Sequence, residues 1–173
     1  MKIREMVLRD IEGLLPTERF SSLTPWSRQT FLNELRNPFS SCFVVTMKDD
    51  PPWATTGFIC FHDVGKESEI LNLSIHPLYR RRGLGRKLME FYLDRCAARG
   101  IERSHLEVSV SNQAALQLYF SFSYEKVGLR KKFYRGRTDA LLLTKRIEMD
   151  SSRNGIRKAE ETFLPIPMDV EEA

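Results

Sequence analysis

The sequence has no long apolar run. None of its windows approaches the stretch of about 18 consecutive apolar residues that a membrane-spanning helix needs. The N-terminal stretch MKIREMVLRDIEGLL carries charges throughout and lacks the apolar core of about 7 residues found in secretory signals. We therefore expect a cytoplasmic protein without a membrane segment, a signal peptide or a transit peptide.

Cysteine and histidine are both scarce, with three of each. Cys42, Cys60 and Cys96 are odd in number, far apart and set in apolar surroundings, which is typical of buried free thiols in a reducing compartment. Neither a CxxC pair nor a Cys and His spacing typical of a metal site occurs, so we expect no bound metal.

Length and composition suit a single domain. The chain has 173 residues and is 42% hydrophobic, which allows one sizeable core and leaves little room for a second catalytic domain. After Ile147 the periodicity stops, and the final segment contains Pro165 and Pro167 and ends in acidic residues. We predict a folded domain over residues 1–148 and a flexible tail over residues 149–173.

The formal net charge of +4 is unevenly distributed. Residues 151–173 hold three basic and five acidic side chains, so they carry −2 and the rest of the chain carries +6. A basic body favours an anionic partner such as a nucleotide-like cofactor or an RNA-associated target, although an ordinary soluble basic surface gives the same balance.

Apolar periodicity predicts a mixed α+β order of elements without internal repeats. Strands are expected at residues 3–7, 42–47, 55–61, 70–75, 106–110, 124–128 and 140–147. Helices are expected after Asp10, after Ser27, from Leu84 to a C-cap at Gly100, and after Ser111 or Asn112. The run from 42 to 75 predicts an antiparallel meander, and residues 130–137 a basic loop between the last two strands.

The most informative segment is LNLSIHPLYRRRGLGRKL, at residues 71–88. An apolar run leads into a turn of arginines and two glycines, and an amphipathic helix follows. Gly83 and Gly85 allow a tight turn with N–H groups pointing the same way, and the helix adds the positive end of its dipole. The turn is neither a Walker A loop nor a complete Rossmann fingerprint, whose third glycine position is Leu88. The turn alone could bind several kinds of anion, and a cofactor that carries a diphosphate is the ligand it favours most.

Four blocks of the sequence resemble the GNAT family of acetyl-CoA-dependent N-acetyltransferases. Arg80, Gly83 and Gly85 satisfy the family pattern Q/R-x-x-G-x-G/A. The strand LNLSI before the turn, LEVSVSN at 106–112 and LQLYFSFSYE at 116–125 match the other blocks in order and spacing. The resemblance covers roughly residues 3–147, nearly the whole predicted domain.

Within that family the chain is similar to the RimI branch, which acetylates protein N-terminal amines, typically the alanine of a ribosomal protein. PWS at 25–27, the glutamate of LEV and KKFY followed by DALLL carry this similarity. The sequence departs from the pattern in two places: Ser123 stands where a glycine is usual, and the segment Lys132, Phe133 and Tyr134 stands where NYY is common.

The resemblance implies the GNAT fold, a mixed and mostly antiparallel central sheet flanked by helices, with acetyl-CoA as co-substrate. It implies that one strand contacts the acetyl and pantetheine portion, that the turn cradles the diphosphate and that a later asparagine touches the cofactor arm. The residues concerned are Leu73, Ser74, Ile75, Arg80, Arg81, Arg82, Gly83, Leu84, Gly85, Arg86 and Asn112.

An amine must be neutral to attack a thioester. An α-amine with a pKa of ~7.7 to 8.0 is ~10 to 20% neutral near pH 7, whereas a lysine at ~10.4 is under ~0.1% neutral, so an N-terminal acceptor needs only a modest base. Glu107 and His105 alternate with an aliphatic trio and share one strand face. A solvated carboxylate is the usual state of a lone strand glutamate, but the resemblance favours Glu107 as the base, with His105 in reserve.

The departing thiolate needs a proton, and the resemblance implies Tyr119 as the donor. On spacing alone, a tyrosine about two helical turns after Asn112 is more often a core residue. Tyr134 is the candidate clamp for the incoming peptide. Trp26 and Phe31 are candidates for the opposite wall, but their helical spacing favours core packing.

We therefore expect an enzyme that transfers acetyl from acetyl-CoA to a protein N-terminus, in one direct step within a ternary complex. No Ser/His/Asp order or nucleophilic cysteine suggests a covalent intermediate. A ribosomal protein is the expected partner, with no direct contact to nucleic acid. The alternatives are a GNAT enzyme acting on small amines or lysine side chains, and a non-catalytic ribosome- or RNA-associated module whose basic loop binds phosphates.

Overall fold

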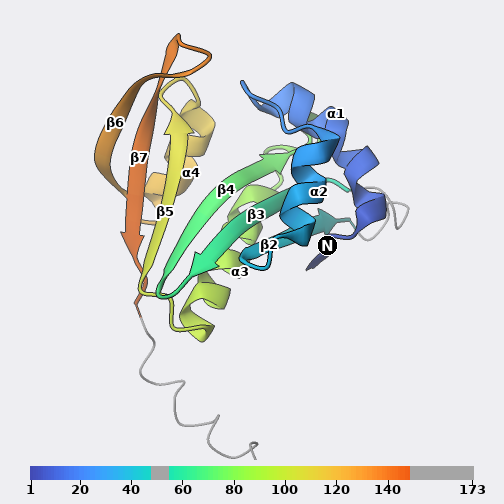
Figure 1. Cartoon of the computed structure of the whole chain (residues 1–173), viewed down its shortest axis with the longest axis horizontal. Coiled ribbons are helices and arrows are strands. Elements are labelled where there is room, and N and C mark those ends of the chain that lie inside the picture. The colour runs from blue at the N-terminus through green and yellow to red at the C-terminus, as the bar shows by residue number, and fades with distance from the viewer. Residues whose placement is uncertain (48–54, 149–173) are drawn as a thin grey trace, which may run out of the picture.

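A seven-stranded sheet runs through the molecule (Figure 1). The computed structural model describes residues 1–47 and 55–148; the predicted tail and the Pro-containing connection of the first hairpin lie outside them. The strands are β1 (Lys2–Glu5), β2 (Ser40–Thr46), β3 (Gly57–Val64), β4 (Glu67–Ile75), β5 (Arg103–Ser109), β6 (Glu125–Tyr134) and β7 (Thr138–Arg146). Their order is β1-β2-β3-β4-β5-β7-β6, and β4 and β5 form the one parallel pair among them.

Helices cover both faces of the sheet. They are α1 (Ile11–Ser21) and α2 (Arg28–Arg36) on one face and α3 (Leu84–Ala98) and α4 (Gln113–Ser121) on the other, with short 3₁₀ turns η1 (Leu8–Asp10) and η2 (Pro77–Tyr79) (Figure 1). The α+β class and the mixed, mostly antiparallel sheet predicted from the sequence are confirmed.

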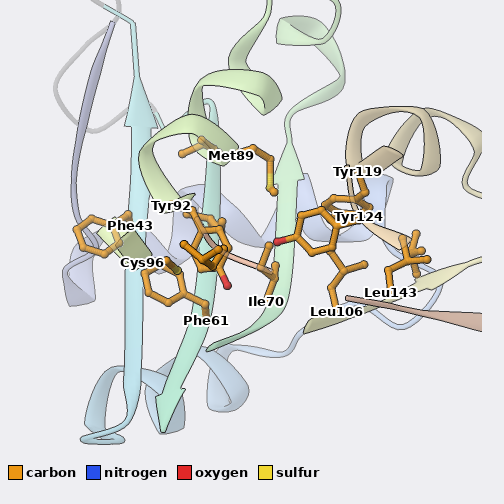
Figure 2. Close-up of a cluster of buried hydrophobic side chains, with 14 of the residues drawn as sticks. Phe43, Phe61, Ile70, Met89, Tyr92, Cys96, Leu106, Tyr119, Tyr124 and Leu143 are labelled. Atoms are coloured by element: carbon orange, nitrogen blue, oxygen red, sulfur yellow. The ribbon is translucent and has the colours of Figure 1, made fainter. Parts of the chain in front are cut away.

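Alternating side chains divide the core into two layers. On β2, Phe43 and Val45 pack toward α3, while Val44 packs toward α1 and α2. The α3 layer is rich in aromatic rings; Phe61 and Tyr92 meet edge to face with ring centroids 4.8 Å apart (Figure 2). Full burial of such side chains is worth roughly 1.5–3 kcal/mol each, so these layers fix the frame that carries the site.

The second layer settles the role of two aromatic residues. Phe31 is fully buried, and its ring lies 5.2 Å from that of Trp26 and 5.2 Å from that of Phe58. Core packing, the interpretation favoured by the helical spacing, is confirmed for Trp26 and Phe31. Ser27 caps α2, as predicted, by accepting from the Thr30 N–H at 3.1 Å.

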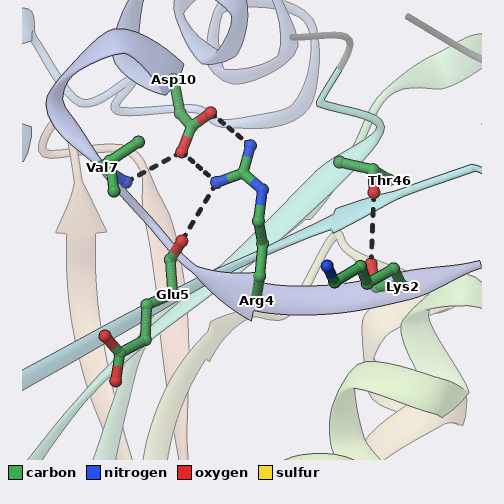
Figure 3. A network of polar contacts seen from close by, with 6 residues as sticks. All are labelled: Lys2, Arg4, Glu5, Val7, Asp10 and Thr46. Carbon is green, nitrogen blue, oxygen red and sulfur yellow. Dashed lines mark hydrogen bonds and ion pairs between the residues drawn. The ribbon is translucent and has the colours of Figure 1, made fainter. Parts of the chain in front are cut away.

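Asp10 joins β1 to α1 in a way that the sequence did not indicate. Its carboxylate does not cap α1; it accepts two bonds from Arg4, at 2.6 and 2.7 Å, and one from the Val7 N–H at 2.8 Å (Figure 3). Burial by itself would raise the pKa of Asp10, but the Arg4 and Val7 hydrogen bonds and the charges of Arg4 and Arg9 outweigh it and lower the net pKa.

Replacing Asp10 with alanine is expected to lower the free energy of unfolding by about 2 kcal/mol near neutral pH, because Arg4 and the Val7 N–H lose their acceptor. Because the pKa of Asp10 is lower in the folded protein, its carboxylate stabilises the fold fully above the unfolded pKa of about 3.9. This stabilisation is lost as the pH falls through the pKa of the folded state. Urea unfolding at about pH 7 and about pH 3 should thus give a gap between wild type and variant that shrinks in acid.

The matched control for this experiment is Glu12→Ala. Glu12 forms an exposed ion pair with Arg28, and its removal should change the free energy of unfolding by less than about 0.5 kcal/mol. An Asp10→Ala gap of equal size at both pH values would contradict the assignment.

Most predicted elements are present, but several boundaries differ: β3 continues to Val64 and β4 begins at Glu67, where the strands were predicted to end at 61 and to begin at 70. The meander of β2, β3 and β4 is antiparallel as predicted, and Gly100 takes the left-handed conformation, with φ of +72°, just past α3. All three cysteines are free and buried. The basic loop predicted at 130–137 is shorter, because β6 continues to Tyr134.

None of the helices within residues 1–47 and 55–148 combines the length and apolar character that crossing a membrane requires.

Candidate active site

The parallel strands β4 and β5 separate halfway along their length. Their pairing ends at Ile70 and Leu106; beyond it β4 pairs with β3 and β5 with β7 (Figure 1). Leu71 is an extra residue on β4 at this point, where the register with β3 shifts. The end of β4 therefore presents a main-chain edge to the gap between the diverging strands.

Leu73 and Ile75 direct their N–H groups to this edge. The His76 N–H donates to the Thr56 carbonyl at 2.8 Å, so the Ile75 carbonyl, across the same trans peptide, points away from β3. In a strand the N–H and C=O of one residue point to the same side, and every second residue repeats the direction. Two main-chain donors thus face the gap, where a thioester carbonyl needs one for its developing charge.

The arginine and glycine turn forms the N-terminus of α3. Gly83 is the N-cap residue with φ of +78°, a left-handed conformation that favours glycine. The first-turn N–H groups of Leu84, Gly85 and Arg86 have no acceptor four residues back within the helix, so they are directed outward together with the helix dipole. This geometry suits an anion such as a diphosphate.

Arg80 holds the turn to its surroundings. Its Nε donates to the Ile75 carbonyl at 3.1 Å and its Nη2 to Ser21 Oγ at 2.8 Å, so the guanidinium ties the turn to the end of β4 and to α1. Arg81 is exposed and has a positive φ of 62°. That backbone strain in a non-glycine residue is typical of a turn held in place by its surroundings.

Two further arginines frame the turn. Arg82 lies 5.3 Å from the centroid of the Tyr79 ring. Arg86 donates to Ser121 Oγ at 2.9 Å and lies 4.9 Å from the centroid of the Phe122 ring. Both side chains remain exposed, which leaves their charge available to an anionic ligand.

Substitution of Gly83 by valine is expected to raise the Kd for acetyl-CoA at least about tenfold. A Cβ at this position would meet no atom within 4 Å, so the effect comes from the left-handed backbone, which costs roughly 1–2 kcal/mol for a residue with a side chain and shifts the N–H groups of the turn. Isothermal titration with acetyl-CoA measures the change.

Gly100→Val is the matched control. Gly100 closes the same helix, has φ of +72° and likewise has open space around it, so it carries similar strain far from the turn. Both variants should lose stability, and only Gly83→Val should lose cofactor affinity. Equal loss of affinity in both variants would contradict the assigned role of the turn.

Helix α4 lies against the first turn of α3. A Cβ on Gly85 would lie 3.4 Å from Leu118 Cδ2, so the two helices approach closely there. Asn112 caps α4 by accepting from the Ala115 N–H at 3.2 Å, and its contact with the cofactor stays a prediction. Tyr119 projects from α4 into the core and is 6% exposed.

The pKa values of Tyr119 and Tyr134 are both raised. Burial raises the pKa of Tyr119 well above its usual range, and Tyr134 adds to the rise. Burial, followed by the charge of Glu107, raises the pKa of Tyr134. Tyr119 is therefore protonated near neutral pH, and the catalytic roles of Tyr119, Tyr134 and Glu107 stay predictions.

Glu107 lies just past the last residue of β5 that pairs with β4. Its side chain is 19% exposed, and Oε1 lies 3.2 Å from Nη1 of Arg130 on β6. Both residues line a groove of about 430 Å³, together with His105 and Glu69 on the same side of the sheet. A carboxylate half-open to a groove has the access that a base for an incoming amine needs.

His105 and Ser74 have other partners. His105 Nδ1 lies 3.1 Å from Thr144 Oγ1, and the ring lines the same groove as Glu107. The Ser74 side chain turns away from the gap toward α1, where its hydroxyl donates to Glu18 at 2.8 Å. By the alternation described above, the Ser74 N–H and C=O point toward β3, so its contact with the cofactor stays a prediction.

Known proteins match this arrangement over most of the chain. The profile of the Acetyltransferase (GNAT) family matches residues 6–123. The chain belongs to the GNAT family of acetyltransferases. This assigns the diverging strands and the glycine turn to the acetyltransferase fold that the sequence resemblance predicted.

Relatives of this GNAT chain include a Bacillus subtilis (strain 168) protein provisionally named a [ribosomal protein bS18]-alanine N-acetyltransferase. It is 33% identical over 143 residues, which is 82% of this chain and 92% of the relative. The [ribosomal protein bS18]-alanine N-acetyltransferase of Escherichia coli (strain K12) is 29% identical over 150 residues, 85% of this chain and 98% of the relative.

Solved structures agree with this GNAT fold. The crystal structure of the Escherichia coli enzyme matches with a TM-score of 0.77 and 28% identity, covering 88% of this chain and 97% of that one. Arabidopsis thaliana NAA60 in complex with acetyl-CoA matches in fold with a TM-score of 0.75 at 19% identity, covering 84% and 98%.

Sequence reasoning missed two polar residues of this GNAT site. Arg130, the ion-pair partner of Glu107, was placed in a loop because no apolar alternation marks that part of β6. Glu18, the buried acceptor for Ser74, went unnoticed, although a carboxylate in the apolar stripe of Ile11 and Leu14 is a visible signal.

Proposed function

We propose that this acetyltransferase transfers the acetyl group of acetyl-CoA to the N-terminal α-amine of a protein, with the N-terminal alanine of ribosomal protein bS18 as its acceptor in the cytoplasm. The observation that carries the proposal is the end-to-end match to the Escherichia coli enzyme of that name, which spans 85% of this chain and 98% of the relative.

In this proposal the cofactor lies along the end of β4 and over the N-terminus of α3. The N–H groups of Leu73 and Ile75 hold the acetyl and pantetheine portion, and the turn from Arg80 to Arg86 holds the diphosphate. Asn112 contacts the cofactor arm. Acetyl-CoA supplies the activated acetyl group, and the side chains supply orientation and proton transfer.

The acceptor amine approaches from the Glu107 side, with Tyr134 against its peptide backbone. Glu107 takes the ammonium proton, directly or through one water, and releases it to solvent through the groove. The neutral amine attacks the thioester carbonyl, and Glu107 takes the second proton from the nitrogen as the tetrahedral intermediate collapses to the amide. Tyr119 shares its proton with the departing thiolate. The thiolate is a weaker base than a tyrosinate, so only partial proton transfer is needed in the transition state. The transfer is direct, without an acetylated enzyme.

The test is an acetylation assay on a peptide panel. One peptide carries the bS18 N-terminus, its twin is blocked at the α-amine, and a lysine peptide and a polyamine serve as further acceptors. We expect acetylation of the free N-terminus and none of its blocked twin. Preference for the polyamine or for the lysine peptide would overturn the proposed acceptor.

A thermal-shift measurement separates the enzyme from a non-catalytic RNA-associated module. A ligand at ~100 times its Kd adds ~2.7 kcal/mol to the free energy of unfolding, so acetyl-CoA should raise the Tm clearly. An unchanged Tm would favour the module.

A further inference from the structure

Glu18 is a buried carboxylate that the proposed mechanism does not use. Its exposure is 0%, and it extends the apolar stripe of α1 that begins at Ile11. Burying a carboxylate is costly unless donors surround it. Its two donors are the Trp26 N–H, at 2.9 Å from Oε2, and the Ser74 hydroxyl, at 2.8 Å from Oε1.

These donors belong to different parts of the site. Ser74 lies between Leu73 and Ile75, the residues whose N–H groups face the gap between β4 and β5. Trp26 ends the segment that joins α1 to α2 and directly precedes the N-cap of α2. The positive end of the α2 dipole stabilises a carboxylate at this place.

The next turn of α1 makes a second attachment to β4. Ser21 Oγ lies 3.5 Å from the Ile75 carbonyl oxygen, and Arg80 donates both to Ser21, at 2.8 Å, and to Ile75, at 3.1 Å. Glu18, Ser21 and Arg80, which we call the α1 brace, thus connect the end of β4, the glycine turn and the segment before α2.

We propose that Glu18 is a positioning residue for acetyl transfer, which sets residues 22–27 against the end of β4 so that the acceptor amine meets the thioester held there. The inference rests on the proposed function. In Figure 1 the α1 side and the β6–β7 hairpin lie on opposite sides of the diverging strands. In the proposed function the acceptor amine approaches from the Glu107 side, between these two parts. Because β3 holds β4 as far as Ile75, loss of Glu18 displaces the acceptor side more than the cofactor side.

Glu18→Ala is expected to lower kcat/KM for the acceptor peptide by about 100-fold, the effect of a displacement of about 1 Å between reacting groups. The Kd for acetyl-CoA should stay within about threefold of wild type, since β3 still holds β4 in place. Glu12→Ala, on an exposed position of the same helix, is the matched control and should leave both constants unchanged.

Glu18→Gln should restore kcat/KM to within about threefold of wild type. Its amide oxygen accepts from the Trp26 N–H and its NH₂ donates to Ser74 Oγ, whose own proton turns to Asn72 Oδ1 at 3.2 Å. A Glu18→Gln enzyme as inactive as Glu18→Ala would overturn the inference, because it would give the negative charge itself a chemical role. A Glu18→Ala enzyme with a lower Tm but wild-type kcat and KM would overturn it as well.

Hydrogen exchange on the acetyl-CoA complex tests the brace without any acceptor. Glu18→Ala should speed exchange of the Trp26 amide by about tenfold or more, since that N–H loses its acceptor. Unchanged exchange would overturn the inference. A wild-type enzyme that acetylates no N-terminal peptide would instead overturn the proposed function, and the exchange comparison would still decide the role of Glu18.

Discussion

Tyr119→Phe is expected to lower kcat by about 100-fold or more, the usual loss when a general acid is removed, with little change in the Kd for acetyl-CoA. The phenol is buried on α4, and its raised pKa keeps the hydroxyl protonated. Phenylalanine fills the same space, so the core stays packed while the thiolate loses its proton donor. Single-turnover rates, with cofactor affinity from titration, measure both quantities.

Tyr124→Phe is the matched control for this experiment. The Tyr124 ring lies 5.8 Å from that of Tyr119 (Figure 2), and its hydroxyl makes a hydrogen bond with Ser104 in the buried core. Its loss should lower the Tm and leave kcat near the wild-type value. Equal losses of kcat in the two variants would indicate that Tyr119 acts through packing, and an unaffected Tyr119→Phe enzyme would remove it from the mechanism.

Glu107→Gln is expected to lower kcat/KM by about 100-fold near pH 7 and to steepen its pH dependence. Without a base, only the amine that is already neutral reacts, and with an α-amine pKa of ~7.7 to 8.0 this fraction falls about tenfold for each unit of pH below that range. The log of kcat/KM should therefore rise with a slope near one between about pH 6 and 7.5, steeper than in wild type.

His105→Gln distinguishes the two candidate bases. His105 lies two residues before Glu107 and lines the same groove, so its variant disturbs the same surface. If Glu107 is the base, His105→Gln keeps the wild-type pH profile. A steepened profile in His105→Gln, with an ordinary one in Glu107→Gln, would transfer the role to His105.

Local sequence signals predicted well the elements that build the proposed cofactor half of the site. The turn at Gly83, the amphipathic helix after it and the C-cap at Gly100 depend on residues close together in the chain, where conformational preference and periodicity act directly. The three-stranded meander was predictable for the same reason, because its strands follow one another.

The acceptor half depends on contacts that the sequence does not mark. Glu18 and Ser74 are 56 residues apart. The point where the β4–β5 pairing ends depends on the pairing of β4 with β3 and of β5 with β7, which are long-range contacts. The end of β6 was taken for a loop because the strand is mostly exposed on both faces and therefore shows no alternation.

Ser123 gives a clear answer to one sequence irregularity. It stands where the family resemblance leads one to expect glycine, and its φ is +60°, so the backbone keeps the left-handed turn that glycine adopts more easily. The shape of the turn after α4 is preserved at some cost in strain.

Strand β6 lies at the edge of the sheet, and its irregular course bears on solubility. Val127, Leu129 and Phe133 are exposed along it, and a straight edge of this kind would offer another chain a template for aggregation. Two register shifts, between Lys126 and Gly128 and between Arg130 and Tyr134, break the edge into short pieces, and lysines flank them. The strand that carries Tyr134, the proposed peptide clamp, thus also has the irregular edge that disfavours pairing with further chains.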